Sequence, residues 1–271
     1  MHKITYIKNN IEVIIFFVLV IIFIILLLRR SWEGFYNDQN GINRLDAIIY
    51  ININKNNIDN SNLIMKELEK LNTNKNKIHK ANCLSNLKNE VDASFQSHIV
   101  ALKMVKDNNW KKVLILEDDM ELDVPPEEFN NLLNKTFDNL DKKTINWDVL
   151  MLSSSNKHIN TKIDPIIIEG VTNTESEEPL KIQKLKSATS YSAYIVKDTY
   201  VDSILKLYDT EPTMPTMPSD PNDPENPMAN MPMPSIPMHI FKFITFYQKI
   251  EYLQNKDNWY VINKNIIKQR T

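Results

Sequence analysis

The sequence predicts an α/β fold, with a mixed sheet flanked by helices and one transmembrane helix in front of it. Two observations predict this fold. From residue 45 onward, short apolar runs rich in β-branched residues alternate with segments that carry apolar residues at helical spacing. Near the N-terminus, 16 apolar residues follow one another without interruption, from Val13 to Leu28.

These patterns divide the chain into a membrane part and one domain. Allowing for the membrane segment, the 271 residues suffice for one sizeable core. We expect an N-terminal tail at 1–10, a transmembrane anchor at 11–30, a stem at 31–44 and a folded domain at 45–271, with an insertion at 211–238.

The apolar run is the predicted anchor. At about 1.5 Å per residue it is slightly short for a hydrocarbon core, but flanking residues can snorkel and the bilayer can thin. A cleaved signal peptide is the alternative, although the run is long for one and RRSWEGF follows it instead of a small-residue cleavage site. Basic residues lie on both sides, so the positive-inside rule gives no firm orientation. We expect a single-pass membrane protein, with a type II orientation as the first hypothesis.

Composition excludes several classes of function. The net charge is −2 and the lysines are scattered, so the chain has no footprint for nucleic acid, which we do not expect as a partner. With only three glycines, the chain has no glycine-rich phosphate loop. Cys83 is the only cysteine, which excludes an internal disulfide.

Within the domain, strands and helices are expected to alternate. Residues 72–89 are poorly patterned. Residues 211–238 hold nine of the 13 prolines and six of the 11 methionines, which predicts an extended or disordered surface insertion. We expect strands at 47–53, 113–116 and 147–152, a strand pair within 182–196 and a final strand ending at 262, with helices at 63–71, 92–108, 127–140 and 199–207 and a short one from 247.

The most informative stretch is KKVLILEDDMELD, residues 111–123. The apolar run Val113 to Leu116 predicts a central strand, and it ends in three adjacent carboxylates, Glu117, Asp118 and Asp119. Ligands in open α/β sheets bind outside the carboxyl ends of such strands. Three like charges resist burial, so a hard divalent cation, Mg²⁺ or Mn²⁺, is expected to share them. The alternative is a solvated turn that only ends the strand.

A longer stretch carries a resemblance to a known family. SFQSHIVALKMVKDNNWKKVLILEDDMELD, with Ser97-His98 and the Glu117-Asp118-Asp119 triplet, resembles the core of glycosyltransferase family 25, the lipopolysaccharide-type and procollagen galactosyltransferase family. Further similar segments are AIIYININ with Asn52, WDVLMLSSS, ATSYSAYIV and the closing LQNKDNWYVINKNIIKQRT, so the resemblance covers most of residues 45–271. The family commonly has Gly-Cys before the Ser-His pair, where this chain has Ala93-Ser94.

The resemblance implies a fold, an activity and partners. It implies a GT-A-like, nucleotide-sugar-binding fold and a membrane-anchored glycosyltransferase that moves a hexose, galactose or glucose, from a UDP-sugar to a hydroxyl of a glycan or protein acceptor. The developing charge on the diphosphate leaving group calls for a divalent metal, Mn²⁺ or Mg²⁺. The alternative is a catalytically inactive glycan-binding or structural relative of the same fold.

The resemblance also implies roles for named residues. Asp119 is expected to be the leading metal ligand and Asp118 a second one, while both of them, with Glu117 and Asn52, are expected to bind the donor.

Ser97 and His98 are expected to bind substrate, with structural alternatives, a helix cap for Ser97 and packing at a helix N-terminus for His98. Because the family is regarded as inverting, a general base is needed for the acceptor. The catalytic residue is unknown from the sequence: Asp220 and Asp223 lie in the right part of the chain but in low-complexity surroundings.

Overall fold

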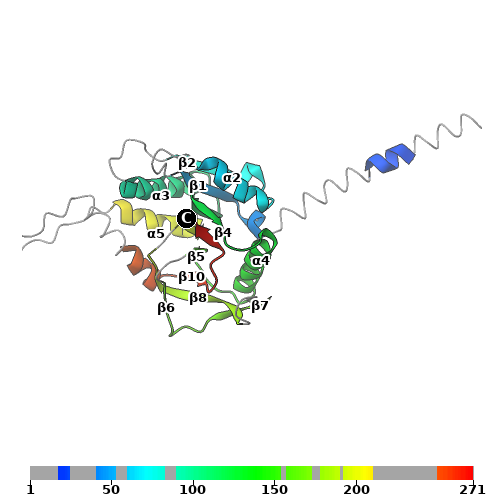
Figure 1. Cartoon of the computed structure of the whole chain (residues 1–271). Coiled ribbons are helices and arrows are strands. Elements are labelled where there is room, and N and C mark those ends of the chain that lie inside the picture. The colour runs from blue at the N-terminus through cyan, green and yellow to red at the C-terminus, as the bar shows by residue number, and fades with distance from the viewer. Residues whose placement is uncertain are drawn as a thin grey trace, which may run out of the picture.

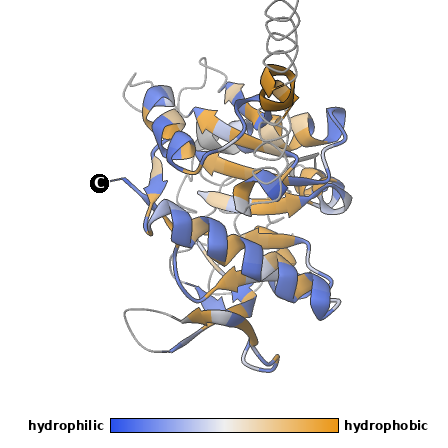
Figure 2. Cartoon of the chain, turned by 90° about the vertical axis from the view of Figure 1, so that its right-hand side faces the viewer, coloured by the Kyte–Doolittle hydropathy of each residue, from blue (hydrophilic) through white to orange (hydrophobic). Residues whose placement is uncertain are grey.

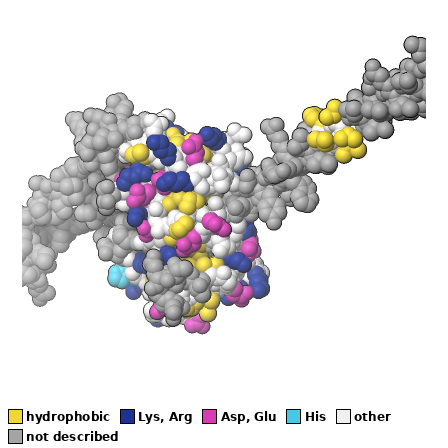
Figure 3. All heavy atoms as spheres, turned by 45° about the vertical axis from the view of Figure 1, so that its right-hand side comes forward, with side chains coloured by type: hydrophobic (Ala, Val, Ile, Leu, Met, Phe, Trp, Pro, Cys, Tyr) yellow, Lys and Arg dark blue, Asp and Glu magenta, His cyan; other side chains and the backbone are white. Residues whose placement is uncertain are grey.

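The computed structural model describes residues 18–24, 41–52, 60–82, 90–153, 157–172, 178–189, 192–209 and 249–270. The predicted tail, most of the anchor and stem, and the 211–238 insertion lie outside these residues. Residues 18–24 are helical, and most of their apolar side chains are exposed, as the isolated hydrophobic group in Figure 3 shows. Within the described ranges, no helix is both long and apolar enough to cross a membrane. The transmembrane helix thus stays a prediction.

A mixed sheet of nine strands forms the centre of the described chain (Figure 1). Its strands are β1 (Ala47–Asn52), β2 (Ile78–Asn82), β3 (Lys112–Glu117), β5 (Val149–Met151), β6 (His158–Ile159), β7 (Ile166–Thr172), β8 (Pro179–Ser187), β9 (Ala193–Lys197) and β10 (Trp259–Ile262). The order is β2-β1-β3-β9-β5-β10-β8-β6, with β7 paired to β8. β2, β1, β3, β5 and β10 all run in one direction, because β9 is antiparallel to both β3 and β5. These five strands end at one edge of the sheet, called here the carboxyl edge.

Helices cover both faces of this sheet. They are α2 (Ser61–Lys70), α3 (Glu90–Asp107), α4 (Pro126–Lys142), α5 (Asp198–Asp209) and a helix at residues 249–256. One apolar cluster joins α2 and α4 to one face, and a second joins α3, α5 and residues 249–256 to the other. Figure 2 shows the consequence, with hydrophobic strands inside and largely hydrophilic outer helix surfaces. The predicted mixed sheet flanked by helices is therefore confirmed.

β3 shows why a continuous apolar run is needed at the centre. Leu114 and Leu116 pack into the cluster on the α2 and α4 face, whereas Val113 and Ile115 pack into the cluster on the α3 and α5 face. All four side chains are at most 2% exposed. A strand covered on both faces has no position left for a polar residue until it reaches its end.

Two expectations about strands need correction. The segment 182–196 contains strand residues of both β8 and β9, but they do not pair: β9 lies between β3 and β5, while β8 pairs with β10. The burial patterns explain this, because β9 is buried at four successive positions whereas β8 alternates as a half-covered strand does. The poorly patterned residues 72–89 contain β2, an edge strand whose mixed polar sequence carries no apolar run.

A second, two-stranded sheet lies beside the carboxyl edge. It pairs β4 (Met120–Leu122), directly after the acidic triplet, with β11 (Ile267–Gln269), near the end of the chain. The sequence patterns predicted neither strand. Their pairing brings the C-terminal segment onto the acidic loop, and this contact shapes the candidate site.

Candidate functional site

The carboxyl ends of β1 and β3 bring the predicted donor-side residues together. β1 ends at Asn52 and β3 at Glu117, and the backbone N–H of Asp118 donates to the Ile51 carbonyl oxygen at 2.9 Å. Asn52, Glu117 and Asp118 are between 2% and 9% exposed. A buried position for Glu117 and Asp118 excludes the alternative of a fully solvated turn.

On the α3 side of this edge, Glu117 faces His98. The His98 Nε2 lies 3.8 Å from Glu117 Oε1, and both side chains are nearly buried. The other ring nitrogen, Nδ1, lies 3.2 Å from the hydroxyl of Tyr194 on β9, whose ring stacks on the imidazole at 5.8 Å between centroids. Burial, and then the negative charge of Glu117, raises the pKa of Tyr194 far above its ordinary value. The phenol therefore stays protonated and can donate.

The Ser97-His98 pair lies inside the helix that was predicted at 92–108, so neither structural alternative for the two residues holds. α3 already begins at Glu90, so both residues lie more than one turn inside it. No proline or glycine between Glu90 and Ser97 stops the helix from extending upstream. Ser97 is fully buried within the helix, and its expected role as a cap is wrong. His98 is likewise not at a helix N-terminus.

On the α2 side of the edge, Asn52 belongs to a polar cluster with Ser61 and Lys80. The Ser61 hydroxyl oxygen accepts from Asn52 Nδ2 at 3.2 Å and from the Lys80 ammonium group at 2.8 Å. Ser61 is the first residue of α2, and Lys80 is on β2 opposite Tyr50. The missed strand β2 thus supplies a cation beside the predicted donor residues, and only recognition of that strand could have found it.

Asp119 is held by the C-terminal segment. Its Oδ2 accepts from Gln269 Nε2 at 2.7 Å, and its carbonyl oxygen accepts from the backbone N–H of Arg270 at 2.8 Å. Lys268 forms an ion pair with Asp123 at 2.9 Å, and Arg270 contacts Glu121 at 3.3 Å. β11 and Arg270 therefore supply donors and positive charge to the acidic segment that follows β3.

The structure itself does not test the predicted metal, and the carboxylates that could hold one are Asp118 and Asp119. Across the described ranges, no group of three or more His, Cys, Asp or Glu side chains is arranged to hold a metal ion. Mg²⁺ and Mn²⁺ favour oxygen ligands, and Mg²⁺ in particular is commonly bound by one or two carboxylates together with substrate phosphates and water. Asp118 and Asp119 could provide such a pair, while Glu117 is engaged with His98.

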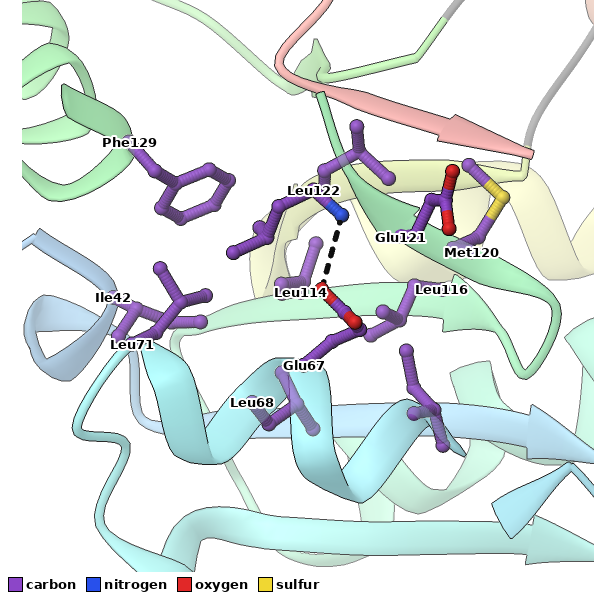
Figure 4. Close-up of a pocket in the computed structure, with 12 residues that line it drawn as sticks. Ile42, Glu67, Leu68, Leu71, Leu114, Leu116, Met120, Glu121, Leu122 and Phe129 are labelled. Atoms are coloured by element: carbon purple, nitrogen blue, oxygen red, sulfur yellow. Dashed lines mark hydrogen bonds between the residues drawn. The ribbon is translucent and has the colours of Figure 1, made fainter. Parts of the chain in front are cut away.

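A small crevice lies on the other face of the sheet and is not this site. Apolar side chains of α2, β3, β4 and α4 line it, including Leu68, Leu114 and Phe129 (Figure 4). At its mouth Glu67 accepts a hydrogen bond from the backbone N–H of Leu122 at 3.4 Å. The crevice is a packing gap between the sheet and β4, and neither His98 nor the acidic triplet lines it.

The family comparison decides what kind of chain this is. A family model described as glycosyltransferase family 25 (LPS biosynthesis protein) matches residues 29–220, well over half of the chain. The chain belongs to glycosyltransferase family 25. The match includes β1, α3, β3 and the acidic triplet, and it ends before β10 and β11. In this family 25 chain, Gln269 and Arg270 therefore reach the acidic loop from outside the matched residues.

The chain was also compared with individual proteins. No curated protein matches the chain. Among solved structures, the crystal structure of A197 from STIV is 11% identical, with a TM-score of 0.34 over 83% of this chain and 84% of that one. A CMP:2-keto-3-deoxy-manno-octonic acid synthetase complexed with CTP is 6% identical, with a TM-score of 0.37 over 79% of this chain and 88% of that one.

Proposed function

We propose that this family 25 chain is a membrane-anchored hexosyltransferase that uses a UDP-sugar. It would transfer galactose or glucose to a hydroxyl group of a glycan or protein acceptor. The observation that carries the proposal is the gathering of Asn52, His98 and the acidic triplet at the carboxyl ends of β1 and β3. Family membership supports sugar transfer, and this edge is where open α/β sheets bind their ligands.

The two sides of the edge suit two parts of the donor. Asn52 and Lys80 offer an amide and an ammonium group near the start of α2, which suit the oxygens of a ribose or diphosphate. Asp118 and Asp119 would hold Mn²⁺ or Mg²⁺, which would neutralise charge that develops on the leaving diphosphate. Glu117, which faces His98, would accept from a donor hydroxyl.

The acceptor side and the membrane part rest on the sequence. The 211–238 insertion falls in the region that we associate with the acceptor, and the apolar run 13–28 would anchor the chain in a membrane with a type II orientation. Ser97 is fully buried, which favours a role in packing His98 over direct contact with substrate.

The test is calorimetric titration of UDP, with and without Mn²⁺, on the full chain and on Asp119→Asn. We expect Mn²⁺ to strengthen UDP binding in the wild type, and we expect this gain to be lost in the variant because one ligand charge is removed. Asp123→Asn is the matched control, since it removes a carboxylate that lies just after β4 and pairs with Lys268 instead.

Three outcomes would count against the proposal. UDP that fails to bind in any condition would favour the inactive glycan-binding or structural relative. Metal-dependent binding that survives Asp119→Asn would refute the metal assignment. If Asp123→Asn loses the Mn²⁺-dependent gain in UDP binding to the same extent, the negative charge of this segment in general, rather than Asp119, is responsible.

A further inference from the structure

His98 is held between two side chains from different strands. Its Nδ1 lies 3.2 Å from the Tyr194 hydroxyl on β9, and its Nε2 lies 3.8 Å from Glu117 Oε1 at the end of β3. All three residues are at most 9% exposed. β9 is the antiparallel neighbour of β3, and Tyr194 lies opposite Ile115 in the register. The position of the phenol is thus set by the sheet rather than by a loop.

The direction of the hydrogen bond between Tyr194 and His98 decides which ring nitrogen carries the proton. A neutral imidazole has one nitrogen that donates and one that accepts. Tyr194 is buried, and among the described residues His98 Nδ1 is the one hydrogen-bond partner of its hydroxyl, so the hydroxyl proton has this nitrogen as its acceptor. The ring proton then belongs on Nε2, the nitrogen that faces the Glu117 carboxylate.

We propose that Tyr194 is a positioning residue that holds His98 in the Nε2–H tautomer, so that the protonated nitrogen faces the Glu117 carboxylate at the carboxyl edge. The role in sugar transfer rests on the proposed function, whereas the tautomer does not. A phenylalanine at this position would keep the ring stacking and lose only the hydroxyl. The hydroxyl is therefore the part of Tyr194 that the proposal concerns.

Nitrogen NMR on the full chain tests the tautomer directly. The chain has five histidines, so ¹⁵N-histidine labelling gives few signals. The His98 signals are the ones that disappear in the variant His98→Gln. In the wild type near neutral pH, Nε2 should show the shift of a protonated nitrogen and Nδ1 that of an acceptor. A wild-type ring with its proton on Nδ1 would overturn the proposal without any variant.

The variant Tyr194→Phe removes the hydroxyl that fixes the tautomer. We expect its His98 signals to move toward a mixture of the two tautomers. The matched control is Tyr200→Phe, because the Tyr200 hydroxyl is also partly buried but bonds to Asp257 and Trp259. A His98 tautomer that is the same in Tyr194→Phe as in the wild type would contradict the proposal.

Turnover of a UDP-sugar separates positioning from general destabilisation. Loss of a partner that orients a site residue should lower kcat by roughly 10-fold or more in Tyr194→Phe, with a much smaller change in KM. Tyr200→Phe should change thermal stability and leave both constants near wild type. An unchanged kcat in Tyr194→Phe would refute the positioning role. If no UDP-sugar is turned over at all, the NMR result still decides the tautomer, and the proposed function fails by itself.

Discussion

Lys184 is a buried cation that holds the turn before β10 in place. Lys184 is 5% exposed, and its ammonium group donates to the backbone carbonyls of Leu185, Gln254 and Asp257. Asp257 in turn accepts from the Tyr200 hydroxyl at 2.7 Å. A lysine with three carbonyl acceptors replaces the water that these groups would otherwise bind.

Replacing this cation should destabilise the protein strongly. In Lys184→Met three buried carbonyls lose their donor, so we expect the free energy of unfolding to fall by about 2–4 kcal/mol. Lys186→Met is the matched control, because Lys186 is exposed on the same strand, and its effect should stay within about 0.5 kcal/mol. Urea unfolding of the two variants measures the difference. Equal midpoints would contradict a structural role for Lys184.

At this scale the sequence predicted the residues on the edge better than those that support them. Asn52, His98 and Glu117 were predicted to lie near one edge, because strand ends and the family resemblance both point to them. Tyr194 and Gln269 were not assigned to the site. Their contribution depends on the pairing of β9 with β3 and of β11 with β4, and pairing between distant strands leaves no local pattern.

Gly41 packs directly against α4. Its backbone N–H donates to Asn134 Oδ1 at 2.8 Å, and the next N–H, of Ile42, donates to Asn130 Oδ1 at 3.0 Å. Its φ is +42°, and a Cβ there would lie 2.6 Å from the Asn130 Cα on α4. The backbone of Gly41 packs so closely against the backbone of α4 that no side chain fits at this position.

A comparison of alanine substitutions at two glycines tests the close packing at Gly41. Gly41→Ala should lower the free energy of unfolding by more than about 2 kcal/mol, because strain at positive φ adds to the clash. Gly170 also has positive φ, but a Cβ there would meet only Lys135 at ordinary contact distance, so Gly170→Ala should cost about 1 kcal/mol. Thermal or urea unfolding decides, and an equal cost would argue against close packing at Gly41.

For elements, predictability followed burial. β3 and β9 are buried on both faces, so their apolar runs were visible in the sequence, and α4 showed a clear helical period. β2, β4 and β11 are edge or short strands with polar residues at many positions. Such strands are specified by their partners, and periodicity alone does not reveal them.

At the scale of the whole molecule, the predicted membrane anchor calls for a direct experiment, because most of it lies outside the described residues. The apolar run 13–28 predicts that the full chain fractionates with membranes and resists carbonate extraction, because about 16 buried apolar residues resist transfer to water. A chain that begins at Arg30 is the control and should be recovered in the soluble fraction. Full chain in the soluble fraction would refute the anchor.

The central claim is that the carboxyl edge of β1 and β3 transfers sugar from a nucleotide donor. Its most direct test incubates the purified full chain with a panel of UDP-hexoses and Mn²⁺ and measures the release of UDP, with Asp119→Asn alongside. We predict that at least one UDP-hexose releases UDP, that chelation of the metal stops this release, and that Asp119→Asn lowers it by several orders of magnitude because charge stabilisation of the leaving diphosphate is lost. Release that is absent with every donor, or equally fast in Asp119→Asn, would contradict the claim.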